Sequence, residues 1–282
     1  MILINGSTGG LGSDLTECLS DDGVAWRAST VAVDDRAAVW DEIRSVRPDV
    51  VLHLAAIVGT KDCDEVPAQA IATNVGGACN VAQAAVAFGA RVVYYSSSAI
   101  FLPGVVPLVE DSPINHEPRT IYGTTKYWGE QVMRKYVPRR DLIVVRPCMG
   151  FGGARDRVSQ LVALIRSHWT RRPVNLLLDM AKLKDYCPVR NISTAVVLLL
   201  RRDLFGATVN VGYGEPEPYG ATIDDLRARG LDPCYRTHPE YDFLGDHVID
   251  TTRLRGFGWE ITVSRGGEIE RAIARCRVEF EG

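Results

Sequence analysis

The first half of the chain alternates short apolar runs with longer amphipathic stretches, and this pattern restricts the possible folds more than any other feature. The runs predict strands at residues 2–4, 24–28, 50–54, 91–95 and 142–145. The amphipathic stretches predict helices at residues 11–19, 36–46, 67–88 and 122–136. Strands and helices that alternate in this way form right-handed crossovers around a buried parallel sheet. We therefore expect an α/β fold with a Rossmann-type, doubly wound parallel sheet.

A glycine-rich stretch follows the first expected strand directly. Its residues are Gly6, Ser7, Thr8, Gly9, Gly10, Leu11 and Gly12. Glycines permit a tight turn and a close approach of the backbone to a phosphate, and the helix that follows supplies free N–H groups and a partial positive charge. The stretch therefore predicts a dinucleotide site, although its spacing differs from GxGxxG and an ordinary glycine-rich turn is the alternative.

The regular alternation weakens after about residue 150. Gly, Pro and Arg become more frequent in irregular stretches such as 150–157 and 212–219. At 282 residues the chain is long enough for one large domain with an appended lobe. We expect residues 1–150 to form a dinucleotide-binding Rossmann domain and residues 151–282 to form mainly a smaller, substrate-binding C-terminal lobe. Residues 188–211 are expected to return to the Rossmann sheet.

The second expected strand bears on the choice of cofactor. Many NAD-binding folds end this strand with an acid that binds the ribose hydroxyls. Here residues 24–30 read VAWRAST and contain no acid. Arg27, Ser29 and Thr30 are able to receive a 2′-phosphate instead, so NADP(H) is favoured over NAD(H). A solvent-exposed surface charge is the alternative for Arg27.

Composition limits the partners. The net charge is −3, so nothing marks the chain as a binder of nucleic acid or of a membrane surface, and a small-molecule substrate is favoured. The seven cysteines include no CxxC pair, which suggests a reducing, cytoplasmic setting. We expect no metal site, no signal peptide and no membrane-spanning segment.

Tyr122 and Lys126 are four residues apart, which places a phenol and an ammonium group on one face of a helix. A free tyrosine has a pKa of about 10, and a neighbouring cation lowers it toward neutrality. Such a pair is common on ordinary amphipathic helices, so its context matters. The strand at residues 91–95 ends in Ser96, Ser97 and Ser98, at the sheet edge where ligands bind in open α/β folds. A hydroxyl there can bind a carbonyl that accepts a hydride.

Six short motifs together resemble one family. They are Gly6-x-x-Gly9-x-x-Gly12, His53-Leu54-Ala55-Ala56, Asn74-Val75-Gly76-Gly77, Ser96-Ser97, Tyr122-x-x-x-Lys126 followed by Gly129-Glu130, and Arg146-Pro147. Through them the chain resembles the extended short-chain dehydrogenases/reductases, the group of sugar-nucleotide epimerases, dehydratases and reductases. The resemblance covers nearly the whole length.

The resemblance implies a role for each motif residue. Tyr122 becomes the general acid/base, Lys126 the ribose ligand and electrostatic partner, and Ser97 the group that orients the carbonyl. Ser98 is expected to contact the substrate. The cofactor is expected to contact Ala55, Ala56, Asn74, Ser96 and Pro147, in addition to the glycine-rich stretch, Arg27, Ser29, Tyr122 and Lys126. For Asn74 a helix cap is the alternative, and for His53 simple packing in a strand is favoured.

Departures from the patterns of individual branches narrow the reaction. In the family that the chain resembles, dehydratases carry Thr-Asp-Glu at the positions of Ser97-Ser98-Ala99. A 3,5-epimerising reductase carries Cys at the position of Ala99. Residues 59–74 look most like the dTDP-4-dehydrorhamnose reductase branch. The resemblance thus implies an NAD(P)H-dependent 4-ketoreductase of a nucleotide-linked keto sugar. A nucleotide-sugar 4-epimerase with bound NAD is the first alternative, and a non-catalytic NADP-sensing regulator is the second.

The substrate lobe is harder to interpret. Arg155 and Arg157 precede an expected helix and are candidates to hold the diphosphate of a nucleotide sugar, because guanidinium groups bind phosphate oxygens in pairs. Lys182, Lys184 and Arg190 are alternatives, and each of these residues is also compatible with an ordinary surface charge. The helices at 67–88 and 122–136 commonly pair across a two-fold axis in this family, so the resemblance implies a homodimer.

Overall fold

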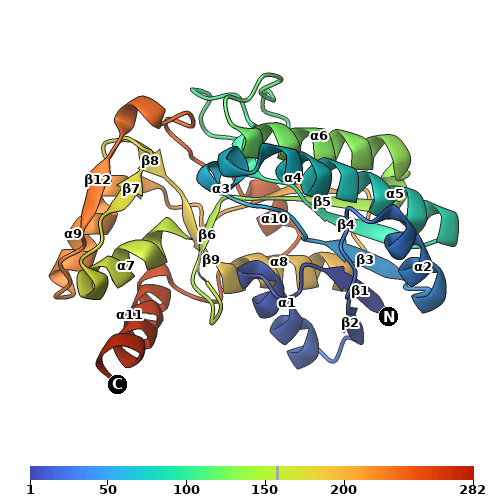
Figure 1. The fold of residues 1–282 in the computed structure, drawn as a ribbon, viewed down its shortest axis with the longest axis horizontal. Coiled ribbons are helices and arrows are strands. Elements are labelled where there is room, and N and C mark those ends of the chain that lie inside the picture. Colours follow the sequence, from blue (N-terminus) through green and yellow to red (C-terminus); the bar gives the residue numbers. More distant parts are fainter. Residues whose placement is uncertain (157–158) are drawn as a thin grey trace.

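The computed structural model describes residues 1–156 and 159–282. Its centre is a six-stranded sheet with the order β10-β5-β4-β3-β1-β2, and every neighbouring pair is parallel (Figure 1). The strands are β1 (Ile2–Asn5), β2 (Trp26–Ala28), β3 (Val50–His53), β4 (Arg91–Tyr95), β5 (Leu142–Pro147) and β10 (Thr208–Val211). The expected Rossmann-type α/β fold is therefore confirmed.

Helices cover both faces of this sheet (Figure 1). One face carries α1 (Gly10–Asp21) and α8 (Val189–Arg201), and the other carries α2 (Arg36–Val46), α5 (Gly77–Phe88) and α6 (Ile121–Tyr136). Successive strand residues point to opposite faces, so Leu3 packs in the α2/α5/α6 layer whereas Ile2 and Ile4 pack in the α1/α8 layer. Both faces are buried, which explains why the strands read as unbroken apolar runs.

The predicted continuous helix at 67–88 is wrong in its middle. The chain forms α3 (Thr60–Glu65) and α4 (Pro67–Ile71), then one π-helical turn at Ala72–Gly76, and then α5. The π turn carries Asn74, whose side chain binds the backbone of Ile57 outside the helix. Helical periodicity alone does not reveal such an insertion, because apolar spacing continues on both sides of it.

The second half of the chain supplies a lobe over the carboxyl ends of the strands (Figure 1). The lobe contains the strand pairs β6 (Met149–Phe151) with β9 (Tyr186–Pro188), β7 (Val174–Leu176) with β12 (Tyr235–Thr237), and β8 (Leu183–Lys184) with β11 (Glu217–Pro218). Its helices are α7 (Gln160–Thr170), α9 (Tyr219–Ala228) and α11 (Arg265–Glu281), and the short α10 (Thr252–Gly256) packs near β10. A separate apolar cluster, which includes Phe151, Leu164 and Tyr219, holds it together. Between β9 and β11 the chain crosses back, so α8 and β10 belong to the main sheet layer.

The described part of the chain contains no helix that is long and apolar enough to cross a membrane. Within that same part, no group of His, Cys, Asp and Glu side chains is arranged to hold a metal ion. All seven cysteines are free thiols.

Candidate active site

A cleft of about 1230 Å³ lies between the carboxyl ends of the sheet strands and the lobe. Gly6, Ala55 and Tyr122 line it from the sheet side, while Tyr186 and His247 line it from the lobe. This is the place where open α/β sheets bind their ligands, because loops after neighbouring parallel strands meet there.

The glycine-rich stretch forms one end of this cleft. Gly6 has a φ of +84°, and a Cβ atom on it would lie 2.7 Å from the backbone nitrogen of Ala55. A Cβ on Gly12 would lie 2.1 Å from the Gly6 carbonyl oxygen, whereas one on Gly9 would meet nothing closer than 3.6 Å. Gly6 and Gly12 therefore let the chain pack, and Gly9 leaves open space before α1. All predicted residues of the stretch except Ser7 line the cleft.

Ser97, Tyr122 and Lys126 come together in the middle of the cleft. The helix α6 begins where it does because the Thr120 side chain accepts a hydrogen bond from the Gly123 N–H at 3.0 Å. This start places Tyr122 in the first turn and Lys126 one turn later on the same face. Ser97 follows β4, and its hydroxyl lies close enough to Tyr122 to act on the pKa of the phenol. The three predicted catalytic residues thus form one centre.

Burial controls the protonation of this centre. It raises the pKa of Tyr122, and the Ser97 hydroxyl opposes the rise only partly. Burial also lowers the pKa of Lys126 to about 8, against the attraction of Glu130. The Lys126 ammonium donates to the Tyr95 carbonyl and lies 4.9 Å from the centre of the Tyr94 ring. The expected lowering of the Tyr122 pKa is therefore not found in the protein alone, because desolvation outweighs the opposing effect of Ser97.

Most of the other predicted contact residues line the cleft. Ala55, Ala56, Ser96, Ser98 and Pro147 do so, and the Ser98 hydroxyl donates to the Pro147 carbonyl at 2.9 Å. These residues join the ends of β3, β4 and β5 into one wall.

Asn74 is not among the residues that line the cleft, and its contact with the cofactor stays a prediction. Its side-chain amide donates to the Ile57 carbonyl and to the Thr125 hydroxyl, both at 2.9 Å, and its oxygen accepts from the Ile57 N–H at 2.8 Å. Asn74 therefore ties the loop after β3 to α6 and positions the catalytic helix.

The predicted 2′-phosphate ligands stand in β2 and directly after it, and they are not among the residues that line the cleft. Arg27 is exposed, and neither Arg27 nor Ser29 lines the cleft. The Ser29 hydroxyl donates to Glu42 at 2.6 Å, and the Thr30 N–H donates to the same carboxylate at 3.1 Å. An acid from α2 therefore stands at the end of β2, although β2 itself has none. Reading the strand alone missed Glu42 because it is thirteen residues away from Ser29 in the sequence.

Of the two predicted substrate arginines, the structure describes only Arg155. Arg155 is exposed and does not line the cleft, and Arg157 lies outside the described residues. Arg119, which the sequence did not single out, lines the cleft, and its guanidinium lies 5.9 Å from the centre of the Phe243 ring. Lys184 lines it too, but its ammonium is buried and held by Asp242 at 2.9 Å from each carboxylate oxygen.

His247 is a further wall residue that sequence reasoning missed. Its side chain is buried, and Nε2 lies 3.5 Å from the Ser98 carbonyl oxygen. Burial lowers the pKa of His247 to about 4, so the imidazole is neutral near pH 7. No local pattern marks it, because residues 98 and 247 meet only through the packing of the lobe on the sheet.

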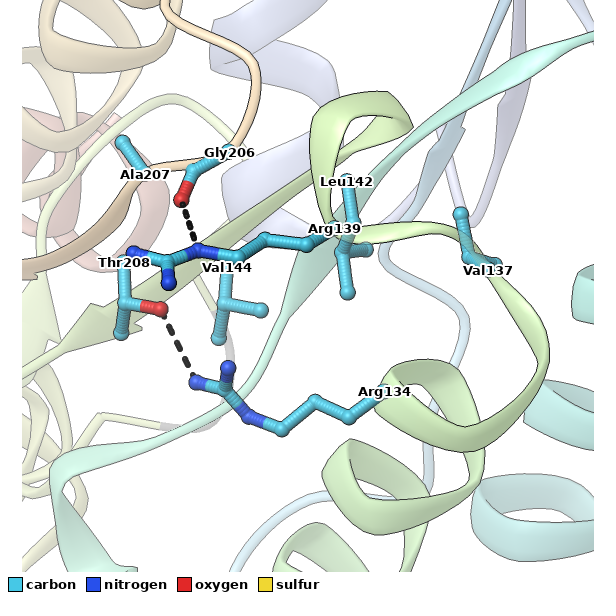
Figure 2. Close-up of a pocket in the computed structure, with 8 residues that line it drawn as sticks. All are labelled: Arg134, Val137, Arg139, Leu142, Val144, Gly206, Ala207 and Thr208. Atoms are coloured by element: carbon cyan, nitrogen blue, oxygen red, sulfur yellow. Dashed lines mark hydrogen bonds between the residues drawn. The ribbon is translucent and has the colours of Figure 1, made fainter.

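A second cavity of about 210 Å³ lies where the end of α6 meets β5 and β10. Figure 2 shows Arg134 and Arg139 on either side of it, donating to the Thr208 hydroxyl at 2.9 Å and to the Gly206 carbonyl at 3.5 Å. None of the predicted site residues lines this cavity, so it is a junction between elements and not part of the candidate site.

A family model described as the NAD dependent epimerase/dehydratase family matches residues 2–212. The chain belongs to this family. The matched segment runs from β1 to β10 and contains Ser97, Tyr122 and Lys126. It confirms the resemblance to extended short-chain dehydrogenases/reductases.

Several relatives of this chain are named dTDP-4-dehydrorhamnose reductase. A dTDP-4-dehydrorhamnose reductase of Streptomyces griseus is 33% identical over 166 residues, which are 57% of this chain and 54% of the relative. The chain therefore matches only about half the length of that relative. The dTDP-4-dehydrorhamnose reductase of Aggregatibacter actinomycetemcomitans is 24% identical over 76% of this chain and 74% of the relative.

Solved structures share the fold over nearly the whole chain. The UDP-glucose 4-epimerase of Thermus thermophilus, in complex with NAD, has a TM-score of 0.83 at 22% identity and covers 98% of both chains. The dTDP-4-dehydrorhamnose reductase of Bacillus anthracis, in complex with NADP, has a TM-score of 0.80 at 20% identity, covering 97% of this chain and 98% of that one.

Proposed function

We propose that the protein is an NAD(P)H-dependent 4-ketoreductase of a nucleotide-linked keto sugar. The observation that carries the proposal is the meeting of Ser97, Tyr122 and Lys126 beside the glycine-rich stretch in one cleft. Relatives named dTDP-4-dehydrorhamnose reductase support the same class of reaction. Ser98 and Ala99 stand next to Ser97 without a carboxylate, which disfavours the elimination of water.

The geometry suits proton donation to a reduced carbonyl. A bound reduced dinucleotide supplies a hydride to the carbonyl carbon, and the carbonyl oxygen then needs one proton to become a hydroxyl. Tyr122 holds that proton because burial raises its pKa. The Ser97 hydroxyl, which lies close to Tyr122, is placed to bind the same oxygen. The Lys126 ammonium stabilises the negative charge that Tyr122 acquires when it releases the proton.

The cleft has room and charge for a nucleotide diphosphate sugar as well as a dinucleotide. Arg119 and Lys61 line its wall, and both side chains are exposed rather than buried in ion pairs. We propose Arg119 as the main contact for the substrate diphosphate, in preference to Arg155, which does not line the cleft.

The cofactor choice rests on two opposing features at the end of β2. The strand lacks an acid, which was the reason to expect NADP(H), and Arg27 is an exposed cation nearby. Glu42 brings a carboxylate to the same place. We propose that the site takes a reduced nicotinamide dinucleotide.

Two further properties follow from the same proposal. The helices α4 and α6, which pack together, expose Ile71 and Trp128, two apolar side chains that a homodimer interface would cover.

Seven free thiols suit a reducing compartment, so we propose a cytoplasmic location.

The deciding experiment follows the absorbance of NADPH and of NADH in the presence of the purified protein and a panel of nucleotide-linked 4-keto sugars. Oxidation of either cofactor by one member of the panel establishes the reductase and names its substrate. Tightly held NAD, with interconversion of hexose epimers and no net consumption of cofactor, identifies the 4-epimerase instead. Cofactor binding without either reaction identifies the non-catalytic regulator.

A further inference from the structure

The end of β2 is organised around one carboxylate from a different element. Glu42 lies in α2 and is half-buried. One of its oxygens accepts from the Ser29 hydroxyl at 2.6 Å, and the other accepts from the Thr30 N–H at 3.1 Å. The Ser29 N–H in turn donates to the Ile4 carbonyl of β1 at 2.9 Å. Ile4 is two residues before Gly6 in the sequence. The bond therefore places Ser29 and its partner Glu42 near the start of the glycine-rich stretch.

In folds of this type, the groups at the end of the second strand meet the adenosine ribose. Ser29 and Thr30 are the donors that a 2′-phosphate would use here, and both already bind Glu42. A 2′-phosphate would have to displace the carboxylate or lie beside it, and like charges at short distance repel. A ribose hydroxyl, in contrast, is a donor that a carboxylate accepts.

We propose that Glu42 is the residue that selects NADH over NADPH. This inference rests on the proposed dinucleotide site. In it, Glu42 of α2 takes the role of the acid that β2 lacks. Asp34 is another carboxylate near this end of the cleft, but it accepts from the Gln69 side-chain amide at 2.9 Å. Asp34 accepts from a side chain of α4 instead of from the Ser29 and Thr30 donors, so we expect its replacement to leave the NADH-to-NADPH ratio unchanged.

The test compares the Kd values of NADH and NADPH for the full-length protein, measured by quenching of protein fluorescence. We expect the wild type to bind NADH more tightly. In Glu42→Gln, the ratio of the two Kd values should shift toward NADPH by about tenfold, because the amide can keep the bonds to Ser29 and Thr30 while the negative charge is lost. Asp41→Asn is the matched control. Asp41 is the neighbouring acid of α2 and pairs with Arg44 at 2.9 Å on the surface, so its loss should leave the ratio within about twofold.

A second variant separates charge from packing. Ser29→Ala removes one anchor of Glu42 but leaves the carboxylate, so the preference for NADH should persist. The inference is overturned if the wild type prefers NADPH, if Glu42→Gln leaves the ratio unchanged, or if Asp41→Asn, Asp34→Asn or Ser29→Ala shifts it equally. If the wild type binds neither cofactor, the proposed function itself fails, which is a different result from an unchanged ratio.

Discussion

Tyr122 and Lys126 share one face of α6, and burial shifts the pKa of each side chain in the direction that favours its neutral form. The pKa of Tyr122 rises and that of Lys126 falls to about 8, because both groups lose water. At neutral pH the centre therefore holds a protonated phenol beside an ammonium that is close to releasing its own proton. This is the state required for protonating a newly formed alkoxide.

Replacing Tyr122 with Phe keeps the ring but removes the proton donor. We expect kcat for keto-sugar reduction to fall by about 10²- to 10⁴-fold, with the Kd of the reduced cofactor unchanged within about twofold. Tyr127→Phe is the matched control, since Tyr127 lies on the same helix and its hydroxyl contacts His116 Nδ1 at 3.0 Å instead. Steady-state kinetics and cofactor titration check both variants, and full turnover by Tyr122→Phe would remove Tyr122 from the mechanism.

The lowered pKa of Lys126 predicts an alkaline limb in the rate profile. Below pH 8 the side chain is charged and stabilises the tyrosinate, and above its pKa of about 8 this charge is lost. Tyr122 stays protonated over the same range because its pKa is raised. We therefore expect kcat/KM for reduction, which reports the free enzyme, to fall above about pH 8. Lys126→Arg keeps its charge and should lose this limb, whatever its residual rate, so a limb at the same pH in both proteins contradicts the assignment.

At the scale of elements, the turn from β1 into α1 separates two tasks among its glycines. Gly6 packs against the backbone of Ala55 and Gly12 packs against the Gly6 carbonyl, so both allow the chain to close, while Gly9 faces open space in the cleft. The free N–H groups of the first turn of α1 are then available to a pyrophosphate. Close packing and ligand binding thus depend on different members of one motif.

This division predicts that an alanine at Gly9 and an alanine at Gly12 differ in their effect on stability. Gly9→Ala should unfold at the wild-type temperature, because its methyl group meets nothing within 3.6 Å, but it should weaken cofactor binding by at least about tenfold. Gly12→Ala places a methyl group 2.1 Å from the Gly6 carbonyl oxygen, so it should also lose about 1 to 3 kcal/mol of stability. Thermal unfolding and cofactor titration measure the two effects. Equal stability losses in both variants would show that the division is wrong.

At the scale of the whole molecule, the sheet and the lobe each supply one side of the cleft. The sheet side carries the candidate catalytic and dinucleotide-binding residues, and the lobe side carries His247 and the Lys184–Asp242 pair. The solvent-exposed surface of α4 and α6, two helices that pack together, includes Trp128 and Ile71, which are 56% and 51% exposed. Exposure of two large apolar side chains on packed helices is what the proposed homodimer requires.

The dimer is tested by charge placed on that face. We expect the wild type to elute from gel filtration with light scattering as two chains, and Trp128→Glu combined with Ile71→Glu to elute as one, because a dimer would bury both carboxylates. Tyr241→Glu is the control, since Tyr241 is 49% exposed but belongs to the lobe. A wild type that is monomeric at all concentrations rules out the proposal.

Patterns within short segments were readable in the sequence because backbone geometry alone sets them. The strand-helix alternation, the glycine-rich turn and the four-residue spacing of Tyr122 and Lys126 required only the periods of strands and helices. The π turn at Ala72–Gly76 escaped prediction because the partner of Asn74 lies outside the helix. Tertiary packing alone decided the upward shift of the Tyr122 pKa and brought Glu42 to Ser29, Arg119 to Phe243 and His247 to Ser98. These features depend on burial and on contacts between separated segments, so no local pattern of residues encodes them.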